Sequence, residues 1–412
     1  MPPENQDQET TRRQPSGAEQ RDGRLSRSLS GTNLERAGDY NQRTVLQAIR
    51  LAGDTTRVEI AEQTGLTAPA IANITTRLTD LGLVRTAGRK QGARGQPALR
   101  LQIAPDGAYG IGLNIDRDHL TLVVLDLAGE VRFRTSREIA FAMPADVTAF
   151  VAAELDPGLA SAGIQRDRIL GVGIAIPDDL GRITLAHQPA GYDVWNDLHV
   201  PDLLAMLPWP IHCDNDAAAA ALGEAQYGAA FESPSFFYLL ISAGLGGGPV
   251  IDRTYHRGAR ARSGEIGLMP DPGGMPGAIV QDIVSLSALH ARLEQAGLPD
   301  TDLAALTATD AATTAVIDRW IEDSVRALTS PLVAINCLLD PDAILIGGRL
   351  PLPLIERLAA ELTAALGALP LPAHAVIRPA VMAQDAPAIG AAILPFLDHL
   401  LPSDSILIQA GR

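Results

Sequence analysis

The 412-residue sequence predicts an α/β body that follows a smaller winged-helix domain. Within residues 211–268, short apolar runs alternate with polar or glycine-rich segments, as strands and turns do in an open α/β sheet. Within residues 34–103, two helix patterns flank a glycine turn and two short strands follow. The sign of the net charge changes near the same boundary. The first 100 residues carry 15 basic and 11 acidic side chains, whereas the rest of the chain carries 18 basic and 37 acidic ones. A basic module on an acidic body is typical of a protein that contacts nucleic acid.

The composition predicts folded domains without a membrane anchor. Hydrophobic residues make up 46% of the chain, which is ample for folded cores. No apolar run reaches the ~18 residues that a membrane span requires, and the polar N-terminus does not resemble a signal peptide. The two cysteines, Cys213 and Cys337, lie far apart in sequence. We therefore expect reduced core thiols and a cytoplasmic location.

Residues 1–30 almost lack large apolar side chains and are expected to form a disordered tail. Residues 31–105 are predicted to form a winged helix-turn-helix domain. Thr56 precedes a short helix, Gly65 supplies the turn, and Thr67 is a good N-cap for a second helix. The expected buried face of this second helix consists of Ile71, Ile74, Leu78 and Leu81.

The opposite face of the second helix suits the major groove of DNA, where asparagine can pair with adenine and arginine with guanine. This face carries Thr67, Ala70, Asn73, Thr76 and Arg77. Two short strands, 83–86 and 98–102, flank a glycine-rich hairpin tip with Arg89, Lys90 and Arg94. We predict that this wing contacts phosphates or a minor groove. The alternative is a winged helix that serves only protein contacts.

The remaining apolar runs alternate between strands and helices, as an α/β fold requires. Strands are predicted at residues 109–114, 119–127, 131–139, 169–176, 211–213, 236–241, 343–346 and 375–379. Helices are predicted at residues 145–155, 279–296, 309–336, 353–366 and 387–400, with Pro157 just beyond the first of them.

Residues 211–268 place polar side chains where strands end. Asn215 and Asp216 follow an apolar run, at the strand end where ligands bind in open α/β sheets. A glycine-rich turn at 244–248 follows the next strand, and its Gly246 and Gly247 would let a ligand's oxygens approach backbone N–H groups. The stretch closes with Glu265 inside a Gly-Glu-Ile-Gly segment.

These motifs resemble those of the ROK family, which contains sugar kinases and sugar-responsive repressors. Family members carry Asn-Asp-Ala, then Gly-x-Gly-Gly-Gly, then Gly-Glu-Ile-Gly-His, and the matching segments here are 215–217, 244–248 and 264–267, with Leu268 replacing the histidine. The resemblance implies a two-lobed actin-like (ribonuclease H-like) ATPase and sugar-kinase fold behind the winged-helix domain. The expected domains are lobe 1 at 106–216 plus 385–400, lobe 2 at 217–384, and a tail at 401–412.

The resemblance also implies roles for individual residues. Asn215, Asp216 and Glu265 would accept hydrogen bonds from sugar hydroxyls, beside Gly246 and Gly247. The residue matching Asp216 is the general base of the family's kinases, so Asp216 is expected to be a vestigial base. The alternative role for Asp216 is a cap of the alanine-rich helix that follows it.

Two departures from the family weigh against phosphotransfer and metal binding. Its kinases hold ATP phosphates with Asp-Ile-Gly-Gly-Thr-Lys, whereas residues 114–119 here are Asn-Ile-Asp-Arg-Asp-His. The two new carboxylates would repel a polyphosphate, so no catalysis and no cofactor are expected. The family's cysteine-rich zinc motif corresponds to 271–280, which contains no Cys or His. We therefore expect no metal site, and a turn at 271–280 held by packing.

The sequence thus predicts a DNA-binding transcriptional regulator, a repressor of carbohydrate-metabolism genes, whose body binds a sugar or sugar-like effector. A homodimer or homotetramer on a double-stranded operator is expected, without contact to a membrane. Two alternatives stay open. One is a ROK sugar kinase. The other is a regulator with a degenerate, non-sugar pocket, because Leu268 and Val280 would each remove a polar contact from it.

Overall fold

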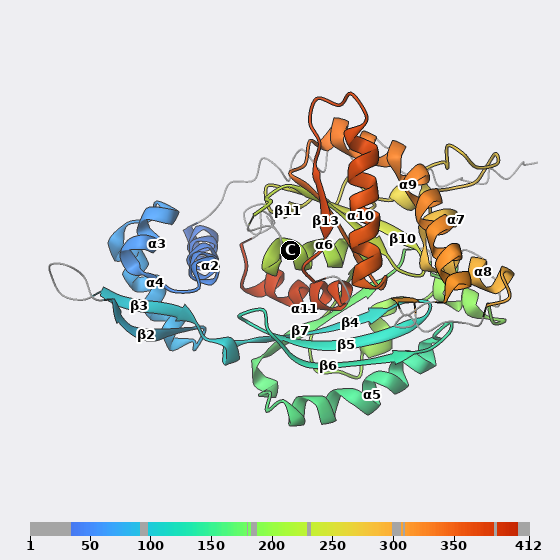
Figure 1. Cartoon of the computed structure of the whole chain (residues 1–412). Coiled ribbons are helices and arrows are strands. Elements are labelled where there is room, and N and C mark those ends of the chain that lie inside the picture. The colour runs from blue at the N-terminus through green and yellow to red at the C-terminus, as the bar shows by residue number, and fades with distance from the viewer. Residues whose placement is uncertain are drawn as a thin grey trace, which may run out of the picture. The chain divides into compact units, whose positions relative to one another are not determined.

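The computed structural model describes residues 34–90, 98–178, 180–182, 188–228, 232–298, 306–307, 310–382 and 385–402 (Figure 1). The chain divides into two units. The N-terminal unit comprises Met1–Asp80, Val84–Gln102 and Leu400–Arg412, and the body comprises Leu81–Leu83 and Ile103–His399. Apart from Leu401 and Pro402, the two predicted tails lie outside the described residues.

The described part of the N-terminal unit has helices α2 (Leu34–Ala52), α3 (Arg57–Thr64) and α4 (Ala68–Asp80) and strands β1 (Thr55–Thr56), β2 (Val84–Lys90) and β3 (Ala98–Ile103). The strands form a sheet in the order β1-β3-β2. Helix α3 begins where the sequence predicts, because Thr56 and Glu59 form a capping box in which each side chain accepts the other residue's backbone N–H. Gly65 ends α3 in the left-handed conformation, with φ of 69°.

The buried face of α4 differs from the prediction at two positions. Ile71 and Leu78 are buried as predicted and Ile74 is half-buried, but Leu81 is 46% exposed and Thr75 is fully buried instead. The Thr75 hydroxyl donates to the Ile71 carbonyl (2.8 Å) and accepts from Nε of Arg57 (2.9 Å), so this polar group is satisfied within the core. Leu81 lies beyond the last residue of α4, so the helical spacing no longer applies to it.

The body contains two five-stranded sheets. The first has the order β6-β5-β4-β7-β8, in which β4 pairs antiparallel with β5 and parallel with β7. Its strands are β4 (Tyr109–Ile115), β5 (His119–Asp126), β6 (Val131–Glu138), β7 (Ile169–Ile176) and β8 (Ile211–Asn215). The second has the order β11-β10-β9-β12-β13. Its strands are β9 (Phe236–Ile241), β10 (Leu245–Ile251), β11 (Thr254–Tyr255), β12 (Ala343–Gly348) and β13 (Val376–Pro379).

Helices cover both faces of each sheet. Helix α5 (Pro144–Ser161) packs on the outer face of the first sheet. The outer face of the second sheet is covered by α7 (Gln281–Val284), α8 (Leu286–Gln295), α9 (Ala311–Leu339) and α10 (Leu352–Gly367). Between the two sheets lie α6 (Asp216–Tyr227) and α11 (Ala386–His399), which pack on each other (Figure 1). Among the described helices, none has the length and apolar composition of a membrane span.

Glycines allow the middle layer to pack backbone against backbone. A methyl group added at Gly390 of α11 would overlap the carbonyl oxygen of Ala219 in α6. Methyl groups at Gly112 of β4 and Gly173 of β7 would overlap carbonyl oxygens of α11. The alanine-rich sequence of α6 therefore serves close helix packing, since only residues without a Cβ, or with a single methyl group, fit there.

Three predicted local features are wrong. Helix α5 continues through Pro157, because Gly158 and Leu159 remain buried on the first sheet beyond it. The helix predicted at 279–296 breaks at Ser285, whose hydroxyl accepts the N–H of Ala288 (3.2 Å) and starts α8. Cys213 and Cys337 are exposed and are not core thiols, because they lie on the edge strand β8 and in the last turn of α9.

Candidate functional site

The predicted DNA-contacting side chains of α4 point to solvent. Thr67, Asn73, Thr76 and Arg77 are exposed, and Ala70 is half-buried. Arg57 of α3, which was not predicted as a DNA-contacting residue, reaches this face with its Nη2 atom 3.4 Å from the Thr76 hydroxyl. No sequence pattern indicates that Arg57, in the first turn of α3, lies near Thr76, because this contact depends on how α3 packs against α4.

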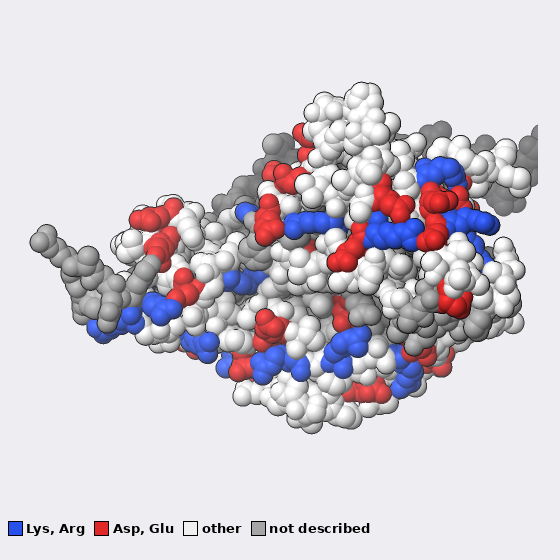
Figure 2. All heavy atoms as spheres, viewed as in Figure 1, with Lys and Arg blue, Asp and Glu red and all other residues white. Residues whose placement is uncertain are grey.

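The predicted wing is an extended hairpin. Strand β2 runs to Lys90, four residues further than predicted, and Arg89 is exposed near its end. The Lys90 side chain and Arg94 lie outside the described part of the chain. Figure 2 shows basic side chains gathered along the wing strands of the N-terminal unit.

In the body, the predicted Asn-Asp pair lies at the start of α6. The Asn215 side-chain oxygen accepts the N–H groups of Ala217 (2.9 Å) and Ala218 (3.1 Å), so Asn215 is the N-cap of α6. Asp216 is buried, and one of its carboxylate oxygens accepts the Ala217 N–H at 2.8 Å. Both side chains therefore stabilise the helix start, whatever else they contact.

Of the glycine-rich segment 244–248, Gly244 lies in the turn between β9 and β10, but residues 245–248 form a strand, contrary to the prediction. Gly246 and Gly247 belong to β10, which pairs antiparallel with β9. A Cβ atom at Gly246 would lie 2.8 Å from the Ala217 methyl group, and one at Gly247 would lie 2.6 Å from the Gly264 carbonyl oxygen. The glycines let β10 fit between the start of α6 and the Gly264 loop, so the segments that carry Asp216 and Glu265 lie on either side of it.

Leu268 and Val280, the two positions where the family's polar side chains are absent, differ in their surroundings. Leu268 is 49% exposed, whereas Val280 is buried in the hydrophobic core beneath the second sheet. The next residue, Gln281, places its amide oxygen 3.2 Å from where a Cβ atom of Gly267 would be, and 3.7 Å from that of Gly244. A polar side chain is thus present beside the glycine-rich strand, one position after the predicted one.

Two arginines that follow β11 meet carboxylates at the ends of the first sheet's strands. Arg257 pairs with Asp214, which is nearly buried, and Arg262 lies 3.8 Å from Asp178. Burial raises the pKa of Asp214 more than the Arg257 charge lowers it. None of these four residues was predicted as a site residue, although Asp214 directly precedes the Asn-Asp motif.

The hairpin between β4 and β5 is filled by its own charged groups. His119 is buried, with Nδ1 2.7 Å from the Asp118 carboxylate and Nε2 3.1 Å from the Asn114 amide. Arg349, which follows β12, donates to Asp118 (2.8 Å) and to Glu138. These contacts connect the second sheet to the first across the hairpin.

The charges in this hairpin determine each other's protonation. Burial alone would raise the pKa of Asp118, but hydrogen bonds and charge from His119 and Arg349 lower it to about 2. Burial alone would lower the pKa of His119, but Asp118 and Asp116 outweigh it and raise the pKa. The hairpin therefore holds an ionised Asp118 between the Arg349 guanidinium and the His119 imidazole.

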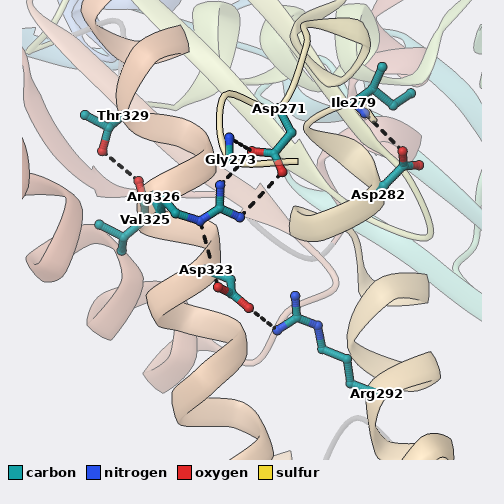
Figure 3. A network of polar contacts seen from close by, with 9 residues as sticks. All are labelled: Asp271, Gly273, Ile279, Asp282, Arg292, Asp323, Val325, Arg326 and Thr329. Carbon is teal, nitrogen blue, oxygen red and sulfur yellow. Dashed lines mark hydrogen bonds and ion pairs between the residues drawn. The ribbon is translucent and has the colours of Figure 1, made fainter. Parts of the chain in front are cut away.

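A polar network holds the loop at 271–280, where packing was predicted (Figure 3). Arg326 of α9 donates to the buried Asp271 carboxylate (2.8 Å), which also accepts the Gly273 N–H (3.1 Å). Pro270 and Ile279 close the loop as an isolated β-bridge. An ion pair thus supports the turn in the segment where the family's motif has cysteines.

Comparison with known proteins identifies the families that the two parts of the chain resemble. The model of the "ROK family" matches residues 110–396, and the model "Winged helix-turn-helix DNA-binding" matches residues 39–85. The uncharacterized protein y4fQ of Sinorhizobium fredii is 30% identical over 325 residues, which are 77% of this chain and 80% of that protein.

Two further relatives are regulators by name. The xylose repressor of Bacillus spizizenii is 25% identical over 232 residues, 56% of this chain and 60% of its own length, so the match spans about three fifths of that relative. The crystal structure of a ROK family transcriptional regulator, a homolog of the E. coli MLC protein, aligns with a TM-score of 0.65 and 21% identity. It covers 91% of this chain and 100% of that one, and confirms the predicted fold.

Proposed function

This chain belongs to the ROK family, and from that membership and its winged helix-turn-helix domain we propose that it is a sugar-responsive transcriptional regulator. It represses genes of carbohydrate metabolism, and its body binds a sugar or a sugar-like effector. The observation that carries the proposal is the exposed face of α4 on a chain whose body has the actin-like fold.

The N-terminal unit supplies the contacts to a double-stranded operator. Asn73 and Arg77 on α4 read base edges in the major groove, as asparagine does for adenine and arginine for guanine. Arg89, with Lys90 and Arg94, contacts phosphates from the wing. A homodimer or homotetramer presents two such units to a palindromic site.

The effector binds around the start of β10. Asn215, Asp216 and Glu265 accept hydrogen bonds from its hydroxyl groups, and Gln281 adds a donor and an acceptor. These residues come from segments that follow different sheets, so an effector there changes the closure of the body around it. Closure then alters the spacing of the two DNA-binding units of an oligomer.

Kinase activity is absent in this proposal. This absence rests on the hairpin at 116–119, where the buried side chains of Asp116 and Arg117 stand at the positions of the two glycines in the family's phosphate site, and Asp116 and Asp118 add carboxylates there. Arg349 and His119 already form hydrogen bonds with the Asp118 carboxylate. Asp216 is the one residue that favours the alternative of a sugar kinase, since it matches the general base.

Thermal shift measurements with sugars, sugar phosphates, sugar acids and ATP–Mg²⁺ test the proposal. A ligand at a hundred times its Kd stabilises the folded state by about 2.7 kcal/mol. We expect a shift with a sugar or sugar acid, its loss in Glu265→Gln, and its retention in the control Glu361→Gln on α10. A shift with ATP–Mg²⁺ would favour the kinase, and no shift with any sugar would favour the degenerate pocket.

Selection of binding sites from random DNA tests the proposed role in DNA binding. Purified protein should enrich a palindromic sequence from a random double-stranded pool, and Arg77→Ala should lose that enrichment. Failure of the wild-type protein to enrich any sequence, with the effector panel present or absent, would contradict a role as a regulator.

A further inference from the structure

One cluster of metal-binding side chains lies away from the proposed effector site. His212 of β8 lies beside Asp398 and His399 at the end of α11, and their ligand atoms all lie within 4.8 Å of one another. Two imidazoles and one carboxylate are a ligand set that suits Zn²⁺ and similar transition-metal ions. The ligands are far apart in sequence, so no motif spacing reveals them.

The state of His212 is a second and independent observation. Its Nε2 atom is buried, and within the described residues no group is within hydrogen-bonding reach of it. A buried ring nitrogen without a partner destabilises the folded state, because water solvates it in the unfolded chain. Coordination of a metal ion by the imidazole would relieve that penalty.

The remaining two ligands stand at a favourable place for a cation. Asp398 and His399 occupy the C-terminal end of α11, where the helix dipole is negative. Their side chains are 60% and 42% exposed, which leaves room for them to turn toward an ion. Zinc–ligand bonds of about 2.0–2.1 Å place tetrahedral ligands about 3.4 Å apart, so ligand atoms that now lie within 4.8 Å of one another need to approach by at most about 1.4 Å.

We propose that His212, Asp398 and His399 bind a divalent transition-metal ion, which fastens the end of α11 to strand β8. Water completes the coordination, as in other sites with three protein ligands. The next residues of the chain belong to the N-terminal unit, where Leu401 is buried and its carbonyl accepts a hydrogen bond from Arg43 of α2 (3.3 Å). The ion therefore orders the body directly before the chain enters the N-terminal unit.

The test uses the full-length chain without a polyhistidine tag, stripped of metal and titrated with ZnCl₂ by calorimetry. We expect one Zn²⁺ per chain and at least about tenfold weaker binding in His399→Ala. His399 is partly exposed, so this variant keeps the fold. Co²⁺ in place of Zn²⁺ should give the visible absorption of a tetrahedral site in the wild type and lose it in the variant.

His290→Ala is the matched control. Its Nε2 atom is also buried without a hydrogen bond among the described residues, but it lies on α8, away from the cluster. We expect this variant to bind zinc as the wild type does. Hydrogen exchange adds a structural readout, since Zn²⁺ should slow exchange at the end of α11 in the wild type and not in His399→Ala.

Three results would overturn the proposal. The first is a wild-type protein that binds no Zn²⁺. The second is binding that persists in His399→Ala and disappears in Asp118→Asn, which would place the ion at the cluster of Asp116, Asp118 and His119. The third is zinc binding that leaves exchange at the end of α11 unchanged.

Discussion

Replacement of Arg326 by glutamine should destabilise the body through a single buried carboxylate. In Figure 3 the Arg326 guanidinium meets Asp271, whose side chain is 1% exposed. Among the described residues, Arg326→Gln leaves the Gly273 N–H as the hydrogen-bond donor to that carboxylate. A hydrogen bond to a charged group contributes about 1.5–3 kcal/mol, and loss of one member of a fully buried ion pair costs about 3–5 kcal/mol. Because the Arg326 side chain is itself 41% exposed, water replaces part of it, and we expect a loss of about 2 kcal/mol.

Urea unfolding followed by tryptophan fluorescence measures this loss, since Trp320 of α9 is fully buried. Arg357→Gln is the matched control, because Arg357 is similarly exposed but pairs with Asp318 and Glu361, whose side chains are 44% and 37% exposed. That pair should contribute about 0–1 kcal/mol. Equal losses in the two variants would refute the reasoning.

The pH dependence gives a second check on the same pair. The Arg326 hydrogen bond is the largest cause that lowers the pKa of Asp271, against a smaller effect of burial. A lowered pKa in the folded state means that the contribution is present above the ordinary value of about 3.9 and is lost as the pH falls through the folded pKa. The difference between wild type and Arg326→Gln should therefore be full at pH 7 and shrink below about pH 4. A difference that stays constant down to pH 3 would show that the pair does not act through the Asp271 charge.

Three other outcomes are expected. Arg77→Ala should weaken binding to the selected operator by about 1–3 kcal/mol in a gel-shift titration, whereas Arg89→Ala should weaken it equally for all sequences and reduce the salt slope by about one. The stability that wild type has over His119→Gln should be full below pH about 6.5 and be lost as the pH rises through the raised folded pKa of His119, as thermal melting across pH 5–9 would show. Gly390→Ala should destabilise the body by several kcal/mol or prevent folding, while Gly367→Ala at the end of α10, with open space around it, should change the free energy of unfolding by less than about 1 kcal/mol. Similar stability of the two glycine variants would contradict the described packing of α6 on α11.

Local signals predicted most of the secondary structure. Strand β7 has the predicted bounds, because an apolar run that ends before Pro177 has little freedom to be anything else. Thr56 and Gly65 fixed the helix-turn-helix through short-range capping bonds. Such features depend on residues that are close in sequence, so they can be recognised without knowledge of the tertiary structure.

Features that depend on distant partners could not be predicted. Thr75 is buried because Arg57 from another helix satisfies its hydroxyl. The glycines of β10 have the composition of a turn, and their role in a strand becomes visible only with α6 on one side and the Gly264 loop on the other. Asp271 accepts a hydrogen bond from Arg326 of α9, and the spacing between these two residues in the sequence gives no indication of the contact. The domain boundaries and the individual ligand-binding and DNA-binding residues remain predictions.

The middle layer of the body has a consequence for its mechanics. Where α11 crosses α6, the surfaces that meet are carbonyl oxygens and methyl groups, because Gly390 and Ala219 have no longer side chains to insert. Interfaces of long side chains must change rotamers before one helix can slide along another, whereas smooth ones slide without that step. The absence of bulk that forbids a single extra methyl group at Gly390 therefore also means that a small shear of α11 along α6 would need no change of side-chain rotamer at this crossing.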